Sequence, residues 1–173
     1  ESGSCRPLRK LPIWKNGRHK APSQCHTLLE LTTGDLTLNI ATNLEWSARY
    51  FPQRPAISQD GTTIRYAELD LTANRVATAL IGLNVEPGDH IGLYAPNSGD
   101  WIAFYFGALK AGVVPVTLSS QLSRDELSLL LNHCQPRMIF TSPEALDRLE
   151  GFRASGGLEK IICPGGDLDM KQL

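Results

Sequence analysis

The sequence predicts an α/β fold in which a partial parallel sheet carries helices on both faces. Apolar strand-like runs alternate with helical runs from His90 to Cys163, and residues 66–84 carry an apolar stripe with a helical period. The 173 residues, 42% of them apolar, are also enough to bury a core of their own. Strands that alternate with helices require crossover connections, which produce a parallel sheet covered on both sides.

The first ordered element is expected from Asn39, in "NIATNLEWSARYFPQRPAIS". Asn39 is suited to cap a helix. Four apolar residues fall on one face of that helix: Ile40, Leu44, Ala48 and Phe51. Pro52 and Pro55 end it, because neither has a backbone N–H to donate. The runs "AIS" and "TTIRY" flank "QDG", which predicts a small hairpin.

A second helix is predicted from Tyr66. Its apolar stripe consists of Leu69, Ala73, Val76, Ala77 and Leu80. Burial of the leucines and the valine would contribute about 1.5–3 kcal/mol each, more than the differences between helix propensities. Asn84 stands where a left-handed residue closes a helix, and "EPGD" follows as a turn.

The remaining elements alternate regularly. The expected strands are "HIGLYA" (90–95), "VVPVTL" (113–118), "RMIFTS" (137–142) and "EKIIC" (159–163). The expected helices cover residues 99–112, 123–134 and 143–155. Ser123 and Glu126 form a capping box at the start of the second of these. The first is expected to dock through four large side chains: Trp101, Phe104, Tyr105 and Leu109.

The net charge is −1, so the overall electrostatic field does not indicate a nucleic-acid partner. Residues 1–38 hold six Lys and Arg against three Asp and Glu, whereas the rest holds eleven against fifteen. The basic leader is rich in Pro, Gly and Ser, which predicts a disordered segment. A transit peptide is the alternative, although Pro7, Pro12, Gly17 and Pro22 break any amphipathic helix.

The chain has four cysteines and no Cys-x-x-Cys pair: Cys5, Cys25, Cys134 and Cys163. So few cysteines in a chain of this size do not indicate the disulfide framework of a secreted protein. No transmembrane segment is expected, because no apolar run is long enough. These observations favour a cytoplasmic protein, with mitochondrial or peripheral membrane association left open. The group His19, Cys25 and His26 does not match a zinc spacing, so no metal ligand is assigned.

Three pairs of residues are candidates for a site. Trp101 and Tyr105 are candidates for lining a ligand tunnel. The core is the favoured alternative, because aromatic residues at helical spacing usually belong to it. Asn97 and Ser98 follow a strand, where open α/β sheets bind ligands, but capping of the next helix is favoured. Asp89 and His90 lie at a turn with no nearby nucleophile. We therefore assign no catalytic, cofactor-binding or metal residue.

Several strings in order carry a resemblance: "ARYFPQRPAI", "TIRYAELDLTANRVATALIGLNVEPGDHIGLYAPNS", "WIAFYFGALKAGVVPV" and "LSRDELSLLLNHCQPRMIF". Together they resemble the N-terminal region of the AMP-forming adenylate synthetases, the AMP-dependent synthetase and ligase superfamily that includes acyl-CoA synthetases of fatty acid metabolism. The resemblance runs from Asn39 to Phe140 and weakens through Cys163. Asn84 replaces a usual Gly, and Ser119 and Ser120 replace a usual Asn-Pro.

The resemblance implies the N-terminal part of the large domain of the acyl-CoA synthetase fold. It also implies an acid-thiol ligase that converts a carboxylic acid and ATP into an acyl-adenylate and then a CoA thioester, with Mg²⁺ as the metal ion. Such enzymes use a Ser/Thr/Gly-rich loop ending in Pro-Lys-Gly, a downstream Glu and a Lys on a small C-terminal domain; residues 1–173 contain no Pro-Lys-Gly.

Residues 39–173 are therefore expected to be an incomplete N-terminal subdomain, truncated before the ATP-binding loop. This fragment would be inactive alone and would bind none of ATP, Mg²⁺ and CoA. Unpaired edges at "VVPVTL" or "RMIF" would favour self-association. Two alternatives stay open: a stand-alone α/β small-molecule-binding or oligomerisation module without catalysis, and a flavodoxin-like binder, for which a phosphate loop is missing.

Overall fold

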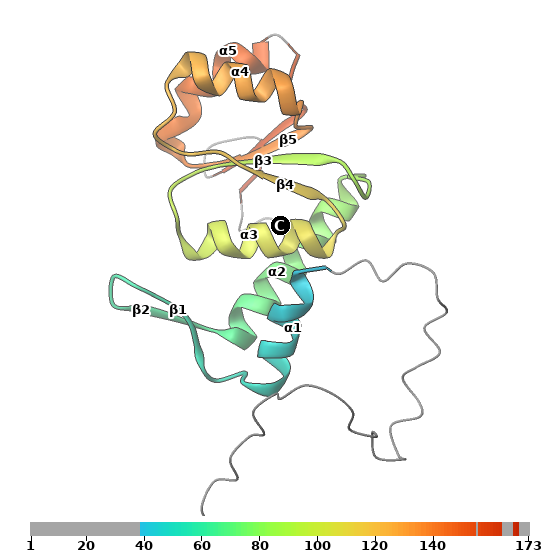
Figure 1. Cartoon of the computed structure of the whole chain (residues 1–173), viewed down its shortest axis with the longest axis vertical. Helices are drawn as coiled ribbons and strands as arrows, with labels where there is room; N and C mark the ends of the chain where they lie inside the picture. Colours follow the sequence, from blue (N-terminus) through green and yellow to red (C-terminus); the bar gives the residue numbers. More distant parts are fainter. Residues whose placement is uncertain (1–38, 155, 164–167, 170–173) are drawn as a thin grey trace, which may run out of the picture. The chain divides into compact units, whose positions relative to one another are not determined.

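The computed structural model describes residues 39–154, 156–163, 168 and 169 (Figure 1). The leader over residues 1–38, with Cys5, His19, Cys25 and His26, lies outside the described residues. Within the described part, no helix combines the length and apolar content needed to cross a bilayer.

A four-stranded sheet with the order β4-β3-β5-β6 forms the centre of the fold. Its strands are β3 (His90–Tyr94), β4 (Val114–Thr117), β5 (Met138–Thr141) and β6 (Lys160–Ile162). All three neighbouring pairs are parallel, with Ile91 opposite Pro115 on one side and Met138 on the other. The predicted parallel sheet is confirmed.

Helices cover both faces of this sheet, as predicted (Figure 1). One face packs against α2 (Tyr66–Gly82) and α3 (Gly99–Lys110), and the other against α4 (Arg124–Cys134) and α5 (Leu146–Ala154). Side chains of β5 alternate between the two cores: Met138 and Phe140 belong to the first, and Ile139 belongs to the second. Every residue of β5 is buried, which is typical of a strand in a doubly covered parallel sheet.

A third cluster lies on the side of α2 and α3 away from the sheet. It joins α1 (Ala41–Tyr50) and the hairpin of β1 (Pro55–Gln59) and β2 (Thr62–Arg65) to those helices. Its buried members are Leu44, Leu69, Ala73 and Ala103. The hairpin turns at Asp60 and Gly61, whose φ angles of 50° and 77° are both left-handed, as a two-residue type I′ turn requires.

The end of α2 follows the prediction closely. All five residues of its apolar stripe are buried. Asn84 has φ 58°, and its N–H donates to the Ile81 carbonyl at 3.0 Å, while the Val85 N–H donates to the Leu80 carbonyl at 3.1 Å. These two bonds form a Schellman motif, so Asn84 performs the closing role usually given to Gly.

Side chains also stabilise the starts of α1 and α4. The N-cap position of α1 is Ile40, which has no side-chain cap, but the preceding Asn39 accepts the Ala41 N–H with its Oδ1 at 2.9 Å and donates its amide to the Leu109 carbonyl at 2.7 Å. The capping box of Ser123 and Glu126 is confirmed, with the Ser123 N–H donating to Glu126 at 2.8 Å. Hydrogen bonds from the Ser123 side chain and backbone hold the pKa of Glu126 below its ordinary value.

Two predicted helix faces were partly wrong. Leu44 is buried in α1, but Ile40 and Phe51 are exposed, because Ile40 precedes the first helical residue and Phe51 leaves the helix with φ −134°. The buried residues of α3 are Ala103, Phe104, Gly107 and Ala108. Trp101 and Tyr105 do pack against the core, but like Leu109 they are only half-buried. The helix therefore docks through Phe104 and several small residues, and the small residues allow a close approach.

The segment predicted as one helix over residues 143–155 is divided. A 3₁₀ turn (Pro143–Ala145) precedes α5, which begins at Leu146. Pro143 is at the first position of that turn, where its missing N–H is not needed.

The predicted sheet edges need one correction. The "RMIF" segment is not an edge, because β5 lies between β3 and β6. The "VVPVTL" segment does lie at an edge, where the Val114 amide donates inward to the carbonyl of Asp89, just before β3, at 2.8 Å and the Leu118 amide donates to that of Leu93 in β3 at 2.9 Å. The backbone groups of Pro115 and Thr117 alternate with these amides and point outward, away from β3. Proline has no N–H to donate to another strand. This edge is therefore a weaker template for association than the apolar sequence indicates.

Gly107 allows α3 to approach α2. A Cβ at this position would lie 2.6 Å from Val76 Cβ and 2.9 Å from the Ala73 carbonyl oxygen. Since one of these neighbours is backbone, the contact cannot be relieved by a rotamer change alone.

We expect Gly107→Ala to lower the free energy of unfolding by about 1–3 kcal/mol, although alanine favours a helix more than glycine does. Gly151→Ala in α5 is the matched control, because a Cβ there meets no atom within 4 Å. The control should leave stability unchanged or raise it by up to about 1 kcal/mol. Urea unfolding followed by circular dichroism measures both, and equal behaviour of the two variants would contradict close packing at Gly107.

Candidate functional site

A cleft of about 610 Å³ opens at the carboxyl ends of β3 and β4. Open α/β sheets bind ligands at this edge of the sheet, outside the ends of the strands. The cleft is lined by Ala95, Pro96, Asn97, Trp101, Thr117, Leu118, Ser119, Ser120 and Gln121. It is therefore built from two segments, one after each strand.

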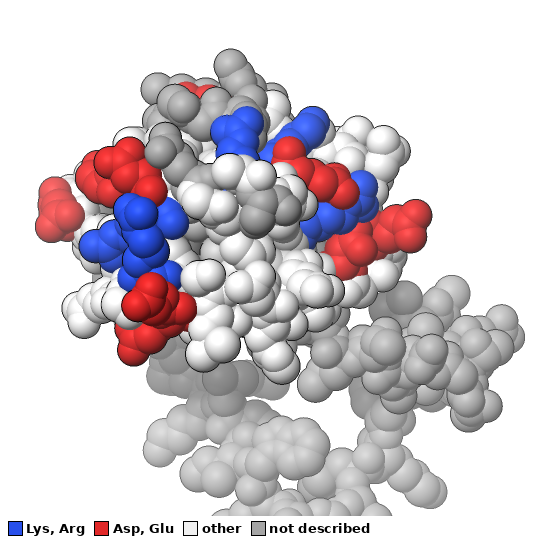
Figure 2. Space-filling view, turned by 90° about the horizontal axis from the view of Figure 1, so that it is seen from above, with Lys and Arg blue, Asp and Glu red and all other residues white. Residues whose placement is uncertain are grey.

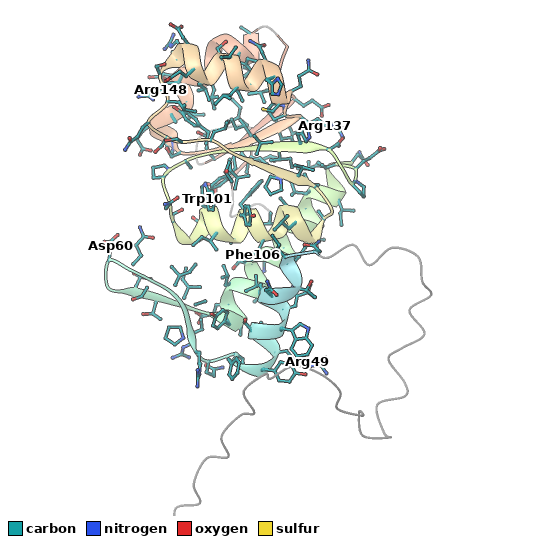
Figure 3. The ribbon with its side chains drawn as sticks, in the orientation of Figure 1. Arg49, Asp60, Trp101, Phe106, Arg137 and Arg148 are labelled. Atoms are coloured by element: carbon teal, nitrogen blue, oxygen red, sulfur yellow. The ribbon has the colours of Figure 1, made fainter. Side chains whose placement is uncertain are left out.

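The first wall is the corner between β3 and α3. Trp101 is half-buried in the first turn of α3 (Figure 3). It stacks on Tyr105, with ring centroids 5.6 Å apart and planes 4° apart. Ser98 caps the helix, since its Oγ accepts the Trp101 N–H at 3.1 Å. The predicted capping role of Ser98 is confirmed, while Asn97 is exposed and lines the cleft.

The second wall is the loop between β4 and α4. Within it, the Ser119 carbonyl accepts the Leu122 N–H at 3.2 Å. Arg148 of α5 holds this loop from outside: its Nη1 donates to the Leu122 carbonyl at 3.0 Å and to the Ser120 carbonyl at 3.5 Å. The same atom donates to the hydroxyl of buried Tyr94 at 3.0 Å. No sequence pattern indicates this role of Arg148, because its partners are more than twenty residues away in the chain.

The chemistry of this cleft is neutral. All nine lining residues are uncharged and offer hydroxyl groups, amide groups, an indole ring and apolar surface. Such a wall fits an uncharged or apolar part of a ligand, but it provides no cation to neutralise a triphosphate. No group of three or more His, Cys, Asp or Glu that could hold a metal ion occurs within the described residues either. These residues by themselves do not fit the phosphates of ATP or a bound Mg²⁺.

Asp89 and His90 lie at the opposite end of the sheet, where the strands begin. The Asp89 carboxylate accepts the Glu86 N–H at 2.9 Å and pairs with Arg137 at 2.8 Å. These two interactions hold the pKa of Asp89 below its ordinary value. The His90 Nδ1 lies 2.7 Å from the Cys134 carbonyl oxygen. Both side chains therefore have structural partners, and the geometry does not favour the acid–base hypothesis.

Arg137 links several elements at that edge (Figure 3). Besides Asp89, it binds Glu159 at 2.8 Å and the carbonyl oxygen of Asn84 at 2.7 Å. The hydrogen bonds that Arg137 donates to the carboxylates of Glu159 and Asp89 raise its pKa above the ordinary value. On the face shown in Figure 2, basic and acidic side chains lie beside one another, without a continuous field of one sign.

The bond between Arg148 and Tyr94 gives a test of how the cleft is built. We expect Arg148→Ala to lower the free energy of unfolding by about 1 kcal/mol, because the buried Tyr94 hydroxyl loses its donor. The same change should cost less in a Tyr94→Phe background, since no hydroxyl is then left unpaired. A double-mutant cycle by urea unfolding measures this coupling, and strictly additive losses would show that the bond does not stabilise the loop.

Comparison with known proteins places this geometry in a family. Residues 44–168 match the AMP-binding enzyme family. The chain is 29% identical over 118 residues to the long-chain-fatty-acid–CoA ligase FadD13 of Mycobacterium tuberculosis, covering 67% of this chain and 24% of that protein. It is 34% identical over 120 residues to the 3-methylmercaptopropionyl-CoA ligase of Ruegeria lacuscaerulensis, covering 67% and 22%.

The solved structures agree. The anthranilate CoA ligase AuaEII, solved with anthranoyl-AMP, superimposes with a TM-score of 0.72 and 28% identity over 77% of this chain and 26% of that one. A benzoate CoA ligase from Burkholderia xenovorans gives a TM-score of 0.68 and 28% identity, covering 75% and 27%. The chain thus spans about a quarter of the length of its relatives. It belongs to the AMP-binding enzyme family, of which it covers an N-terminal portion.

Proposed function

We propose that this chain is part of an AMP-forming ligase that activates a carboxylic acid with ATP and transfers the acyl group to CoA. The observation that carries the proposal is the family match over residues 44–168, together with relatives that are CoA ligases. In this reaction a carboxylate oxygen attacks the α-phosphorus of ATP and pyrophosphate leaves. The CoA thiol then loses its proton and its sulfur attacks the acyl carbon, and the C–O bond to AMP breaks, so that AMP leaves with the electron pair.

The described residues would contribute scaffold and one neutral wall to such an enzyme. Adenylation replaces a poor leaving group with a good one, and cationic groups and a metal ion neutralise the charge that develops on the phosphates. The cleft lined by Asn97, Trp101 and Ser120 has no charged residue, so it would contact an uncharged part of a substrate. The groups that hold the triphosphate and Mg²⁺ would come from the parts of the longer relatives that this chain does not match.

The organisation of the chain is a further part of the proposal. Residues 39–173 would form an incomplete N-terminal subdomain, following a basic leader over residues 1–38. The cysteine pattern favours a reducing compartment such as the cytoplasm. The exposed edge of β4 would be the place for another strand, from the same protein or from a second copy.

A stand-alone binding or oligomerisation module is the second candidate. One observation favours it: the sheet already has helices on both faces, so the chain has a core of its own. The coding DNA beyond Leu173 distinguishes the two. A Ser/Thr/Gly-rich loop ending in Pro-Lys-Gly in the same frame supports the ligase, and a stop codon supports the module.

We expect the isolated 173-residue chain to show no carboxylate-dependent exchange of pyrophosphate into ATP. A protein extended in frame to the length of the relatives should exchange pyrophosphate when its carboxylic acid is supplied. Radiolabelled pyrophosphate exchange measures both, with a mock purification as the control. Exchange by the isolated chain would overturn the scaffold role, and an extended protein that adenylates no acid in a broad panel would contradict the ligase.

A further inference from the structure

The outer side of α1, opposite the side that packs on α2 and α3, carries exposed aromatic rings. Leu44 is buried, whereas Trp46 and Tyr50 project from the other side, one helical turn apart, with ring centroids 4.9 Å apart. Trp46 is 62% exposed and Tyr50 54%, and Phe51, directly after the helix, is 51% exposed. We call these three residues the α1 aromatic surface. Adjacent large apolar side chains of this kind indicate an interaction surface.

A hollow lies near the beginning of the same helix. It has a volume of about 370 Å³ and is lined by Asn39, Ile40, Thr42, Asn43 and Trp46. Ile40, which is 52% exposed, and Trp46 give it apolar area, and the amide of Asn43 can bind a phenol hydroxyl. The beginning of α1 therefore offers a place for a ring, and the end of α1 presents two rings.

Charges on one flank of α1 are complementary in the same way. Glu45 is an anion, and Arg49 is a cation one helical turn later. Lys110 binds the Oε1 of Glu45 at 2.9 Å from the inner side, but the Glu45 side chain stays 52% exposed. Arg49 lies at the end of α1 farther from the sheet (Figure 3). Within the described part of the chain no salt bridge links Arg49 to a carboxylate, so its guanidinium is available to another molecule.

We infer that the α1 aromatic surface forms a two-fold symmetric dimer, in which α1 of one copy lies antiparallel to α1 of a second copy. In such a pair the beginning of each helix lies opposite the end of the other, and each flank meets the same flank of its partner. A two-fold axis at the level of Ser47 is midway between Glu45 and Arg49. It places the rings at the end of each helix over the hollow of the other copy, and each Arg49 beside the opposite Glu45.

A second copy is the occupant that the observations favour, because ring, hollow, cation and anion then all find a partner at once. A nucleic acid would leave the hollow and Glu45 unused, and its bases need free ring faces. Here the Arg49 guanidinium lies 5.9 Å from the centroid of Tyr50, and the Arg54 guanidinium lies 4.9 Å from that of Phe51. One short helix buries less area than a standard interface, so we expect a weak, concentration-dependent dimer. This inference does not depend on the proposed reaction.

Analytical ultracentrifugation of the 173-residue chain over about a hundredfold range of concentration tests the inference. The weight-average mass should rise from that of a monomer toward that of a dimer. Trp46→Gln with Tyr50→Gln should raise the dissociation constant about tenfold or more, because buried aromatic rings dominate interface energies. The matched control is Leu129→Gln with Leu130→Gln on α4, which removes exposed apolar side chains elsewhere and should leave the dissociation constant unchanged.

Charge exchange tests the antiparallel arrangement itself. Glu45→Arg brings like charges together across the two-fold axis, and so does Arg49→Glu, so each variant alone should dimerise more weakly, by about threefold or more. An equal mixture of the two variants should recover the original affinity, because opposite charges then face each other on both sides of the axis. Circular dichroism shows whether each variant keeps its fold, since Glu45→Arg also removes a partner of Lys110. If Glu45→Arg unfolds, Arg49→Glu and the aromatic variant still decide the question.

Several results would overturn the inference. One is a monomer at every concentration. Another is a dimer that the aromatic variant leaves intact, because association would then occur elsewhere, for example at the exposed edge of β4. A mixture of the charge variants that associates no better than either variant alone would contradict the antiparallel pairing. A chain that stays monomeric and binds only an added oligonucleotide or vesicle would show that the surface has a different occupant.

Discussion

The burial of β3 and β5 on both faces is the constraint on which the rest of this structure depends. A parallel strand in the middle of a sheet has no side that water can solvate, so each of its side chains needs a helix opposite it. Phe140 packs toward α2 and α3, while Ile139 packs toward α4 and α5. The helices must therefore come close, and Gly107 permits this on one side by removing the Cβ that would strike Val76.

Charged side chains then fix the two ends of the covered sheet. At the amino-terminal edge, Arg137 joins the ends of α2, β3 and β6 through Asn84, Asp89 and Glu159. At the carboxyl edge, Arg148 holds the loop that forms one wall of the cleft. The first arrangement stabilises the scaffold, and the second shapes the cleft at the carboxyl ends of β3 and β4. Lys110 of α3 joins the three helices α1, α2 and α3, because it donates to Glu45 of α1 and to Asp70 and Asn74 of α2.

The sequence predicted most of the fold, because local signals and global packing agree in it. The stripe of α2, the left-handed Asn84, the capping box of Ser123 and the alternation of strands are all local patterns. The errors came from features that depend on the tertiary structure. Strand order put β5 in the middle of the sheet, and close helix packing buried small residues of α3 completely, whereas Trp101 and Tyr105 pack against the core with part of each ring exposed. Arg148 could not be identified, since its partners are brought to it only by folding.

Native-state hydrogen exchange tests the two-sided burial most directly. If the doubly covered strands form the stable centre, the backbone amides of β3 and β5 should exchange only through global unfolding, with the slowest rates in the chain. The amides of the β1 and β2 hairpin, which has exposed residues in both strands, should exchange faster through local opening. Exchange of the Leu93 and Ile139 amides as fast as those of the hairpin would contradict a sheet stabilised from both faces.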